Sequence, residues 1–286
     1  MSVLGRTYAI LRGTAQKIVR DNGPFLASGL AFNILLYCFP LTLLLVSALG
    51  YVLGESHQTL MQVERALSRL LPRSQRVVVD TLTVVVEHRG LLGGAGFATF
   101  VLFGTFLFGS IRHTLNTVFH VVTPRSLVRG IIVDLLVMTC AGALFVLVIG
   151  VASLLAIIRG FGEQVPLLEP LVGPGMVLAG HMLGFAFTTM LFYILYRFAP
   201  AQRPGGKSLL LGAVSAALLL QVAKWLFAWS VRSAQDQTVW YGAVGGLIFF
   251  IFWLYYASLV FILGATIAWS YEQTEAAEPL AAPSRP

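Results

Sequence analysis

Charged residues are scarce in this chain of 286 residues: Asp, Glu, Lys and Arg make up 11% of it. A typical soluble domain contains about 25% of such residues. Hydrophobic residues account for 57% of the chain. The protein therefore lacks the groups that would cover a water-facing surface, which excludes an ordinary cytosolic enzyme and a disordered chain. Most of the chain is predicted to lie in a lipid bilayer.

Residues that bind metals or cofactors are scarce as well. The two cysteines, Cys38 and Cys140, lie in apolar runs and form neither a disulfide framework nor a thiolate metal site. The sequence has no Walker glycine loop and no His-Glu-x-x-His motif, and its five histidines are scattered. A nuclease would need a paired acid and base, or metal-binding carboxylates, beside a basic groove. We therefore expect no cofactor, no metal, no nucleic-acid partner and no enzymatic activity.

Six apolar segments are long enough to cross the hydrocarbon of a bilayer, which takes about 20 residues. They cover roughly residues 24–53, 91–118, 130–158, 174–198, 208–231 and 242–270. The segments are too long for barrel strands and show no apolar–polar alternation. Since backbone groups in lipid must be hydrogen-bonded internally, continuous helices are expected. The predicted fold class is all-α: a polytopic membrane protein with six transmembrane helices and interfacial amphipathic helices.

The chain divides into three predicted regions. Residues 1–22 form a cytoplasmic amphipathic helix, residues 23–272 the six-helix transmembrane domain, and residues 273–286 a disordered cytoplasmic tail. In the first region an apolar stripe is separate from the basic residues Arg6, Arg12, Lys17 and Arg20. The outer loop 54–90 carries two more amphipathic segments, which serve either as a lid over the bundle or as a gate for a substrate.

Basic residues indicate the orientation. With both termini inside, eleven Lys and Arg residues lie on the cytoplasmic side, seven lie on the outer side, and Lys224 lies within a span. This bias predicts cytoplasmic N- and C-termini. The formal net charge of +7 is then explained by contact with anionic membrane lipids.

Lys224 is the most unusual residue, because an ammonium inside a span costs roughly 2.5–3.5 kcal/mol on insertion scales. Gln221 precedes it by one turn and Ala228 follows it by one turn, so this stripe of the fifth span is expected to face the bundle interior. There Lys224 would bind an anion, such as a phosphate headgroup, from an outward-facing cavity. The alternative is that its aliphatic stem extends to the outer headgroups.

Asp134 is not the expected partner of Lys224. At 1.5 Å per residue, the two positions differ by roughly 16 Å in depth. Three arginines lie nearer to Asp134, at the inner surface: Arg112, Arg129 and Arg197. A structural ion pair of Asp134 with Arg112 is the favoured interpretation.

The end of the second span is polar on two adjoining stripes, one with Ser110 and His113 and the other with Arg112 and Asn116. If the helix extends to His120, these residues form a hydrophilic vestibule on the inner side. If it ends near Arg112, they are interfacial residues. The second alternative is slightly favoured, because the apolar segment before Arg112 already spans the hydrocarbon.

The first span has a polar face that includes Asn33, Tyr37 and Pro40. Pro40 removes a backbone hydrogen bond and is expected to kink the helix. The face either lines a pathway or packs between helices. The full candidate substrate pathway comprises Lys224, Gln221, Asn33, Tyr37, Pro40, Ser110, His113 and Asn116. Two glycine pairs, Gly180-xxx-Gly184 and Gly242-xxx-Gly246, indicate close helix packing.

Several short motifs occur in order along the chain: Asp21-Asn22, Ala27-Ser28-Gly29-Leu30-Ala31-Phe32, Phe39-Pro40-Leu41, Ser110-Ile111, Leu115-Asn116-Thr117, Leu195-Tyr196, Ala223-Lys224, Tyr241-Gly242, Trp253-Leu254-Tyr255 and Leu263-Gly264-Ala265. Over about residues 20–272 the sequence resembles the YihY/BrkB family of bacterial inner-membrane proteins. Thr266 stands where that family usually has a glutamate. The resemblance implies a multi-pass protein of the bacterial inner (plasma) membrane with both ends cytoplasmic. The family has been labelled a ribonuclease and a virulence factor, and some members resemble transporters of lipids.

The expected function is translocation of a lipid or another anionic amphiphile through a polar seam between the first, second and fifth spans. The alternative is a non-transporting envelope scaffold or virulence-associated membrane protein that recruits partners through loop 54–90. A membrane-bound ribonuclease is the least favoured interpretation. Membrane lipids are the expected partners, and a homo-oligomer or envelope proteins are compatible with the sequence.

Overall fold

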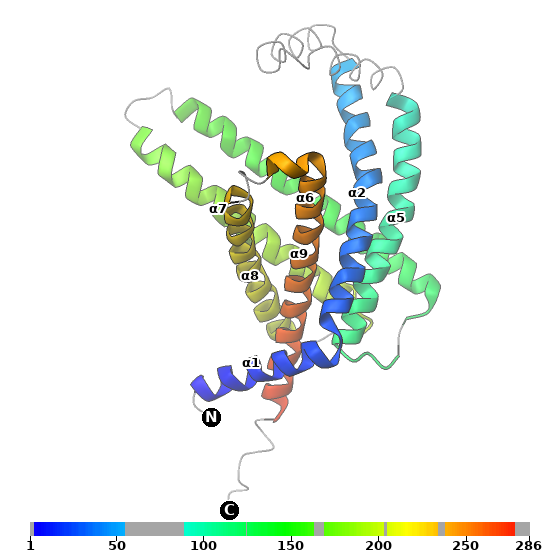
Figure 1. Ribbon diagram of the computed structural model, residues 1–286, viewed down its shortest axis with the longest axis vertical. Helices are drawn as coiled ribbons and strands as arrows, with labels where there is room; N and C mark the ends of the chain where they lie inside the picture. The colour runs from blue at the N-terminus through cyan, green and yellow to red at the C-terminus, as the bar shows by residue number, and fades with distance from the viewer. Residues whose placement is uncertain are drawn as a thin grey trace, which may run out of the picture. The chain divides into compact units, whose positions relative to one another are not determined.

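The computed structural model describes residues 3–54, 89–123, 125–162, 169–202, 205–233 and 238–277. Every regular element within these ranges is a helix (Figure 1). The helices are α1 (Val3–Arg20), α2 (Gly23–Gly54), α5 (Arg89–Val118), α6 (Leu127–Gly162), α7 (Glu169–Phe198), α8 (Gly206–Ser233) and α9 (Thr238–Ala277). Six of them, α2 and α5 to α9, are long and apolar enough to cross a membrane. The all-α class and the six predicted spans are confirmed.

The ends of some elements differ from the predicted ones. Helix α9 continues to Ala277, so the first residues of the predicted disordered tail are helical. Helix α5 continues to Val118, so the favoured prediction of an end near Arg112 is wrong. Almost all of the loop 54–90 lies outside the described residues, and its roles as lid or gate stay predictions.

The described chain forms two compact units, Met1–Phe32 with Phe108–Pro286 and, separately, Asn33–Leu107. In the first unit α8 packs against both α7 and α9. Small residues make this possible: Ala213 and Ala216 of α8 and Ala265 and Ala268 of α9 are fully buried. The first unit therefore has its core where three helices meet through side chains of minimal size.

The closest approach in this core is at Gly212 of α8 and Gly264 of α9. A Cβ atom added to Gly212 would lie 2.5 Å from the carbonyl oxygen of Gly264. One added to Gly264 would lie 2.6 Å from the hydroxyl of Tyr196, which is itself completely buried on α7. That hydroxyl donates a hydrogen bond of 2.6 Å to the carbonyl oxygen of Phe261. Glycine is thus required at both positions by space.

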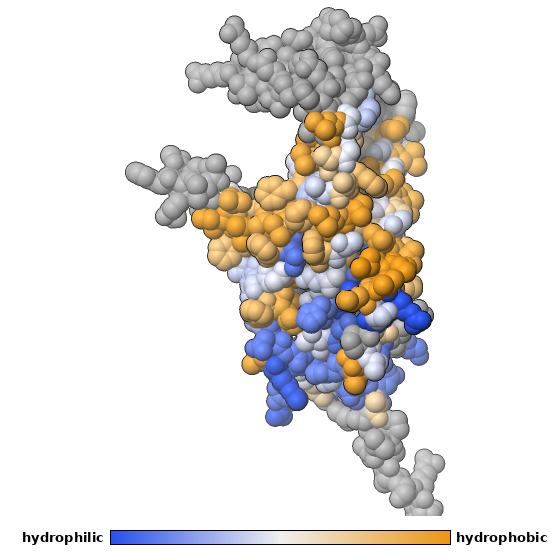
Figure 2. Space-filling model, turned by 90° about the vertical axis from the view of Figure 1, so that its right-hand side faces the viewer, coloured by the Kyte–Doolittle hydropathy of each residue, from blue (hydrophilic) through white to orange (hydrophobic). Residues whose placement is uncertain are grey.

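Helix α1 lies across the C-terminal part of α9 (Figure 1). Thr14 donates a hydrogen bond of 3.2 Å to the hydroxyl of Ser270, and the Arg6 guanidinium lies over the Tyr271 ring. On the face shown in Figure 2, hydrophilic side chains gather at this end, below a surface dominated by apolar side chains. Both α1 and the last turns of α9 therefore lie at one polar end of the first unit.

The second unit consists of most of α2 and the first part of α5. Gly93 and Gly96 of α5 face Ser47 and Leu43 of α2, where added Cβ atoms would lie within 3.3 Å of those side chains. The rings of Tyr37 and Phe100 are 5.0 Å apart. As between α8 and α9, glycines on one helix allow the neighbouring helix to pack closely against it.

Candidate functional site

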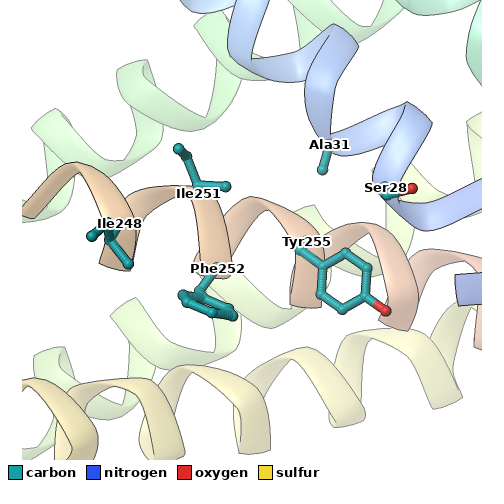
Figure 3. A pocket seen from close by; sticks show the side chains of 6 residues that line it. All are labelled: Ser28, Ala31, Ile248, Ile251, Phe252 and Tyr255. Atoms are coloured by element: carbon teal, nitrogen blue, oxygen red, sulfur yellow. The ribbon is translucent and has the colours of Figure 1, made fainter. Parts of the chain in front are cut away.

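A cavity of about 390 Å³ lies between α2 and α9 in the first unit (Figure 3). Two small residues of α2 and four larger residues of α9 line it: Ser28, Ala31, Ile248, Ile251, Phe252 and Tyr255. In Figure 3 Ser28 and Tyr255 are drawn at the same end of the group, with the Tyr255 hydroxyl directed away from Ser28. The surface that lines the cavity is hydrocarbon.

The cavity belongs to segments that span the membrane. The candidate spans include Gly23–Ala48 of α2 and Gly245–Ala276 of α9. Ser28 lies near the start of its span, and its hydroxyl donates a hydrogen bond of 2.7 Å to the carbonyl of Phe25 in the same helix. Among the lining residues none is charged. A hydrocarbon chain is the chemical group that such a lining solvates best.

Lys224 is not among the residues that line this cavity. It is exposed on α8, next to Trp225, which is 69% exposed. The anion-binding role expected for Lys224 stays a prediction: within the first unit its side chain is not enclosed, and the second unit is described by itself. Lys224 lies only about 20° around α8 from the buried Ala217, but no residue from Leu218 to Ser230 is buried, so it lies beyond the packed part of the helix.

Replacement of Lys224 by leucine should leave the melting temperature of the purified protein unchanged or raise it, because an exposed ammonium on a membrane-spanning helix loses no partner. Thermal unfolding in detergent micelles measures this, with Trp225→Leu at the neighbouring exposed position as the matched control. A lower melting temperature for Lys224→Leu alone would mean that the amine is held by a stabilising contact.

Arg112 and Asp134 form a bidentate salt bridge between α5 and α6. Arg112 Nε lies 3.0 Å from Asp134 Oδ1, and Arg112 Nη2 lies 3.1 Å from Oδ2. The Asp134 side chain is 3% exposed and that of Arg112 is 17% exposed. The guanidinium lies against Gly130, where a Cβ atom would come within 2.8 Å of its central carbon. The geometry suits a fixed structural pair, with planar guanidinium and carboxylate matched in two hydrogen bonds.

The other polar residues at the end of α5 have separate environments. The side-chain oxygen of Asn116 accepts a hydrogen bond of 2.9 Å from the backbone nitrogen of Ala201, which follows α7. Arg125 Nη1 donates to the carbonyl oxygen of Ala199 at 2.9 Å. Ser110 is half-buried and His113 is exposed on α5. Asn116 therefore connects the ends of two helices, which is a structural task.

The predicted pathway residues are divided between the two units. Asn33, Tyr37 and Pro40 belong to the second unit, where Asn33 and Tyr37 are half-buried and Pro40 is fully buried within an uninterrupted α2. Lys224, Gln221, Ser110, His113 and Asn116 belong to the first. Gln221 is half-buried on α8. Within neither unit do these residues line the cavity between α2 and α9.

An ionic cluster that the sequence did not predict is formed by Lys17, Asp21, His120 and Trp269, of which Lys17 and Asp21 are buried. Lys17, assigned above to the polar face of the first helix, is only 4% exposed, and its Nζ lies 2.7 Å from Asp21 Oδ2. Burial lowers the pKa of Lys17, and the hydrogen bond and charge of Asp21 partly offset this effect. The spacing of Lys17 and Asp21, four residues apart on one helix, was the available signal. That spacing does not indicate which other segment of the chain buries the pair.

Groups of three or more His, Cys, Asp or Glu side chains arranged to hold a metal ion are absent from the described part of the chain.

Comparison with known proteins gives the family. The family model described as "Virulence factor BrkB" matches residues 14–286. Similar proteins described as UPF0761 membrane proteins occur in Alkalilimnicola ehrlichii (29% identical over 252 residues) and Azotobacter vinelandii (24% over 261 residues). Another, from Haemophilus influenzae, is 22% identical over 242 residues.

These alignments cover 88%, 88% and 85% of this chain and 55%, 60% and 87% of the respective relatives. The chain thus spans little more than half the length of the first two relatives. No solved structure matches the chain. The six apolar helices agree with the description of the relatives as membrane proteins. Because the family model matches nearly the whole chain, this protein belongs to the YihY/BrkB family of integral membrane proteins.

Proposed function

We propose that this protein binds a bilayer lipid or another anionic amphiphile by its hydrocarbon chain and moves it across the bacterial inner membrane, without catalysing a reaction. The observation that carries the proposal is the cavity between α2 and α9. It lies in membrane-spanning segments, and its lining is hydrocarbon.

The small side chains of α2 support lipid binding at this place. Ala31 contributes a single methyl group to the cavity. A large residue at this position would narrow the space between α2 and α9. An apolar cavity that opens toward lipid takes up acyl chains at little desolvation cost, because the chain exchanges one hydrocarbon environment for another.

The charge of the protein supports an anionic amphiphile over a pure hydrocarbon. The positive charge of the protein supports an anionic headgroup, and the exposed amine of Lys224 adds a contact for such groups on a membrane-spanning helix. Cytoplasmic N- and C-termini, as the distribution of basic residues indicates, are part of the proposal.

Filling the cavity should slow lipid transfer severalfold. Ile251, which is 43% exposed and lines the cavity, is the residue to enlarge, because Ile251→Trp adds volume there with little strain on the core. The measurement is transfer of a fluorescent anionic phospholipid between the leaflets of liposomes that contain the purified protein. Leu247→Trp, at a 54% exposed position one turn away that does not line the cavity, is the matched control.

Two results would contradict the proposal. One is equal lipid transfer in protein-free and protein-containing liposomes. The other is an unchanged rate with Ile251→Trp when the control variant also transfers lipid at the normal rate.

A further inference from the structure

The ionic cluster lies where three elements meet: α1, the residues that follow α5, and α9. The ammonium of Lys17 is in contact with the carboxylate of Asp21 and lies 4.0 Å from the centre of the Trp269 ring. Together with the hydrogen bond from Thr14 to Ser270 and the Arg6 guanidinium over the Tyr271 ring, this contact holds α1 against α9. Whatever changes the charge of the cluster therefore acts on the packing of these two helices.

His120 completes the cluster. Its Nε2 atom lies 2.5 Å from Lys17 Nζ and 3.9 Å from Asp21 Oδ1, and its ring centre is 5.7 Å from that of Trp269. An ammonium only donates hydrogen bonds, so Nε2 must accept here and must carry no proton. A hydrogen bond from Lys17 to Nε2 thus requires the neutral form of His120, with its hydrogen on Nδ1.

His120 has a φ angle of 51°, in the left-handed region where histidine, asparagine and aspartate are the more frequent residues other than glycine. Asn22, which follows Asp21, has a φ angle of 52°. Asparagine and glycine adopt this region at lower cost than histidine, so the backbone alone does not call for histidine at position 120.

Protonation of His120 would remove the acceptor and place a second cation beside Lys17. The charged groups that face His120 in the described residues are Lys17 and Asp21 of α1, with Arg20 acting on Lys17 as a further positive charge. From α9 the uncharged ring of Trp269 faces it. One carboxylate would then neutralise two cations, and the Asp21 carboxylate, which already pairs with Lys17 through Oδ2, is the acceptor for which they would compete.

We propose that Lys17, Asp21, His120 and Trp269 form a proton-binding site, and that binding of one proton from water to His120 Nε2 loosens α1 from α9. The His120 side chain is 52% exposed, so water reaches it without unfolding. Histidine is the side chain that changes charge between about pH 5 and 8. No covalent bond other than the new N–H forms or breaks. The site stands whether or not the protein moves lipid.

Two measurements on the full-length protein in detergent micelles test the site. The first is the fluorescence of Trp269, which a neighbouring imidazolium quenches, followed from about pH 8 to about pH 5. The part of the signal that disappears in Trp269→Phe should fall with pH in the wild type. It should not change in His120→Asn, which keeps a residue suited to the left-handed backbone. The matched control is His113→Gln, at an exposed histidine of α5, which should titrate like the wild type.

The second measurement is the distance between spin labels at Gln16→Cys on α1 and Gln273→Cys on α9, two exposed positions, with Cys38 and Cys140 replaced by serine. A longer distance should gain population at low pH, and His120→Asn should abolish this change. Lys17→Met, which removes the competing cation, should abolish it too. The proposal is wrong if the wild-type distance is the same at both pH values, or if His120→Asn responds to pH as the wild type does.

Discussion

Replacement of Gly264 by alanine is expected to lower the free energy of unfolding by about 3 kcal/mol, the upper part of the usual range for overpacking. The added methyl group would meet the Tyr196 hydroxyl at 2.6 Å and the carbonyl oxygen of Gly212 at 2.8 Å. A backbone oxygen cannot move aside as a flexible side chain does, so α8 and α9 would have to separate. Tyr196 would then lose its hydrogen bond to Phe261, leaving a buried hydroxyl unpaired. Unfolding in mixed detergent and dodecyl sulfate micelles measures the loss.

Gly246 on the same helix provides the matched control. An added Cβ atom there has nothing within 4 Å, so Gly246→Ala should be neutral or stabilise the helix by up to about 1 kcal/mol. Equal stability of the Gly264→Ala and Gly246→Ala variants would contradict the close approach of α8 and α9. Gly212→Ala should behave like Gly264→Ala, because its Cβ atom would lie 2.7 Å from that of Ala268.

The glycines also show which part of the fold the sequence predicts. The six spans follow from hydropathy and length, since the bilayer sets both requirements independently of how helices pack. The spaced glycines Gly180, Gly184 and Gly246 were interpreted as packing contacts, and all three have open space around an added Cβ atom. The tight contacts between α8 and α9 are at Gly212 and Gly264, which belong to no glycine pair but each precede a buried alanine, Ala216 or Ala268, by four residues. Spacing within one helix does not say which side meets a neighbour.

The candidate site depends on the same missing information. Helices that are apolar on all sides have no preferred face. The sequence therefore did not decide which side of α8 packs against its neighbours, or whether Lys224 lies on that side. The residues lining the cavity, such as Ile248 and Ile251, have no chemistry that distinguishes them from other apolar residues. Lys17 was assigned to a polar face because α1 alone is amphipathic, and its burial depends on Trp269, which lies 252 residues further along the chain.

The second large effect is expected at the salt bridge between α5 and α6. Arg112→Met should lower the free energy of unfolding by about 3–5 kcal/mol, because it leaves the Asp134 carboxylate, 3% exposed, without its cation. Asp134→Leu should cost less, since the Arg112 side chain is 17% exposed and reaches water more readily. The loss of stability should therefore be larger for Arg112→Met than for Asp134→Leu, because Asp134 is the more buried partner. Equal losses, or a larger loss for Asp134→Leu, would contradict this geometry.

The double variant Arg112→Met/Asp134→Leu decides what the pair contributes. The attraction within a buried ion pair exceeds the free-energy cost of its desolvation by little. Replacing both partners by apolar residues should therefore restore most of the stability lost in Arg112→Met. Recovery of stability together with normal lipid transfer would identify a purely structural pair. A stable double variant that no longer transfers lipid would instead show that the two charges take part in transport, because the variant would be folded but inactive. A double variant as unstable as Arg112→Met would show that the two matched hydrogen bonds, and not charge neutralisation alone, hold α5 to α6.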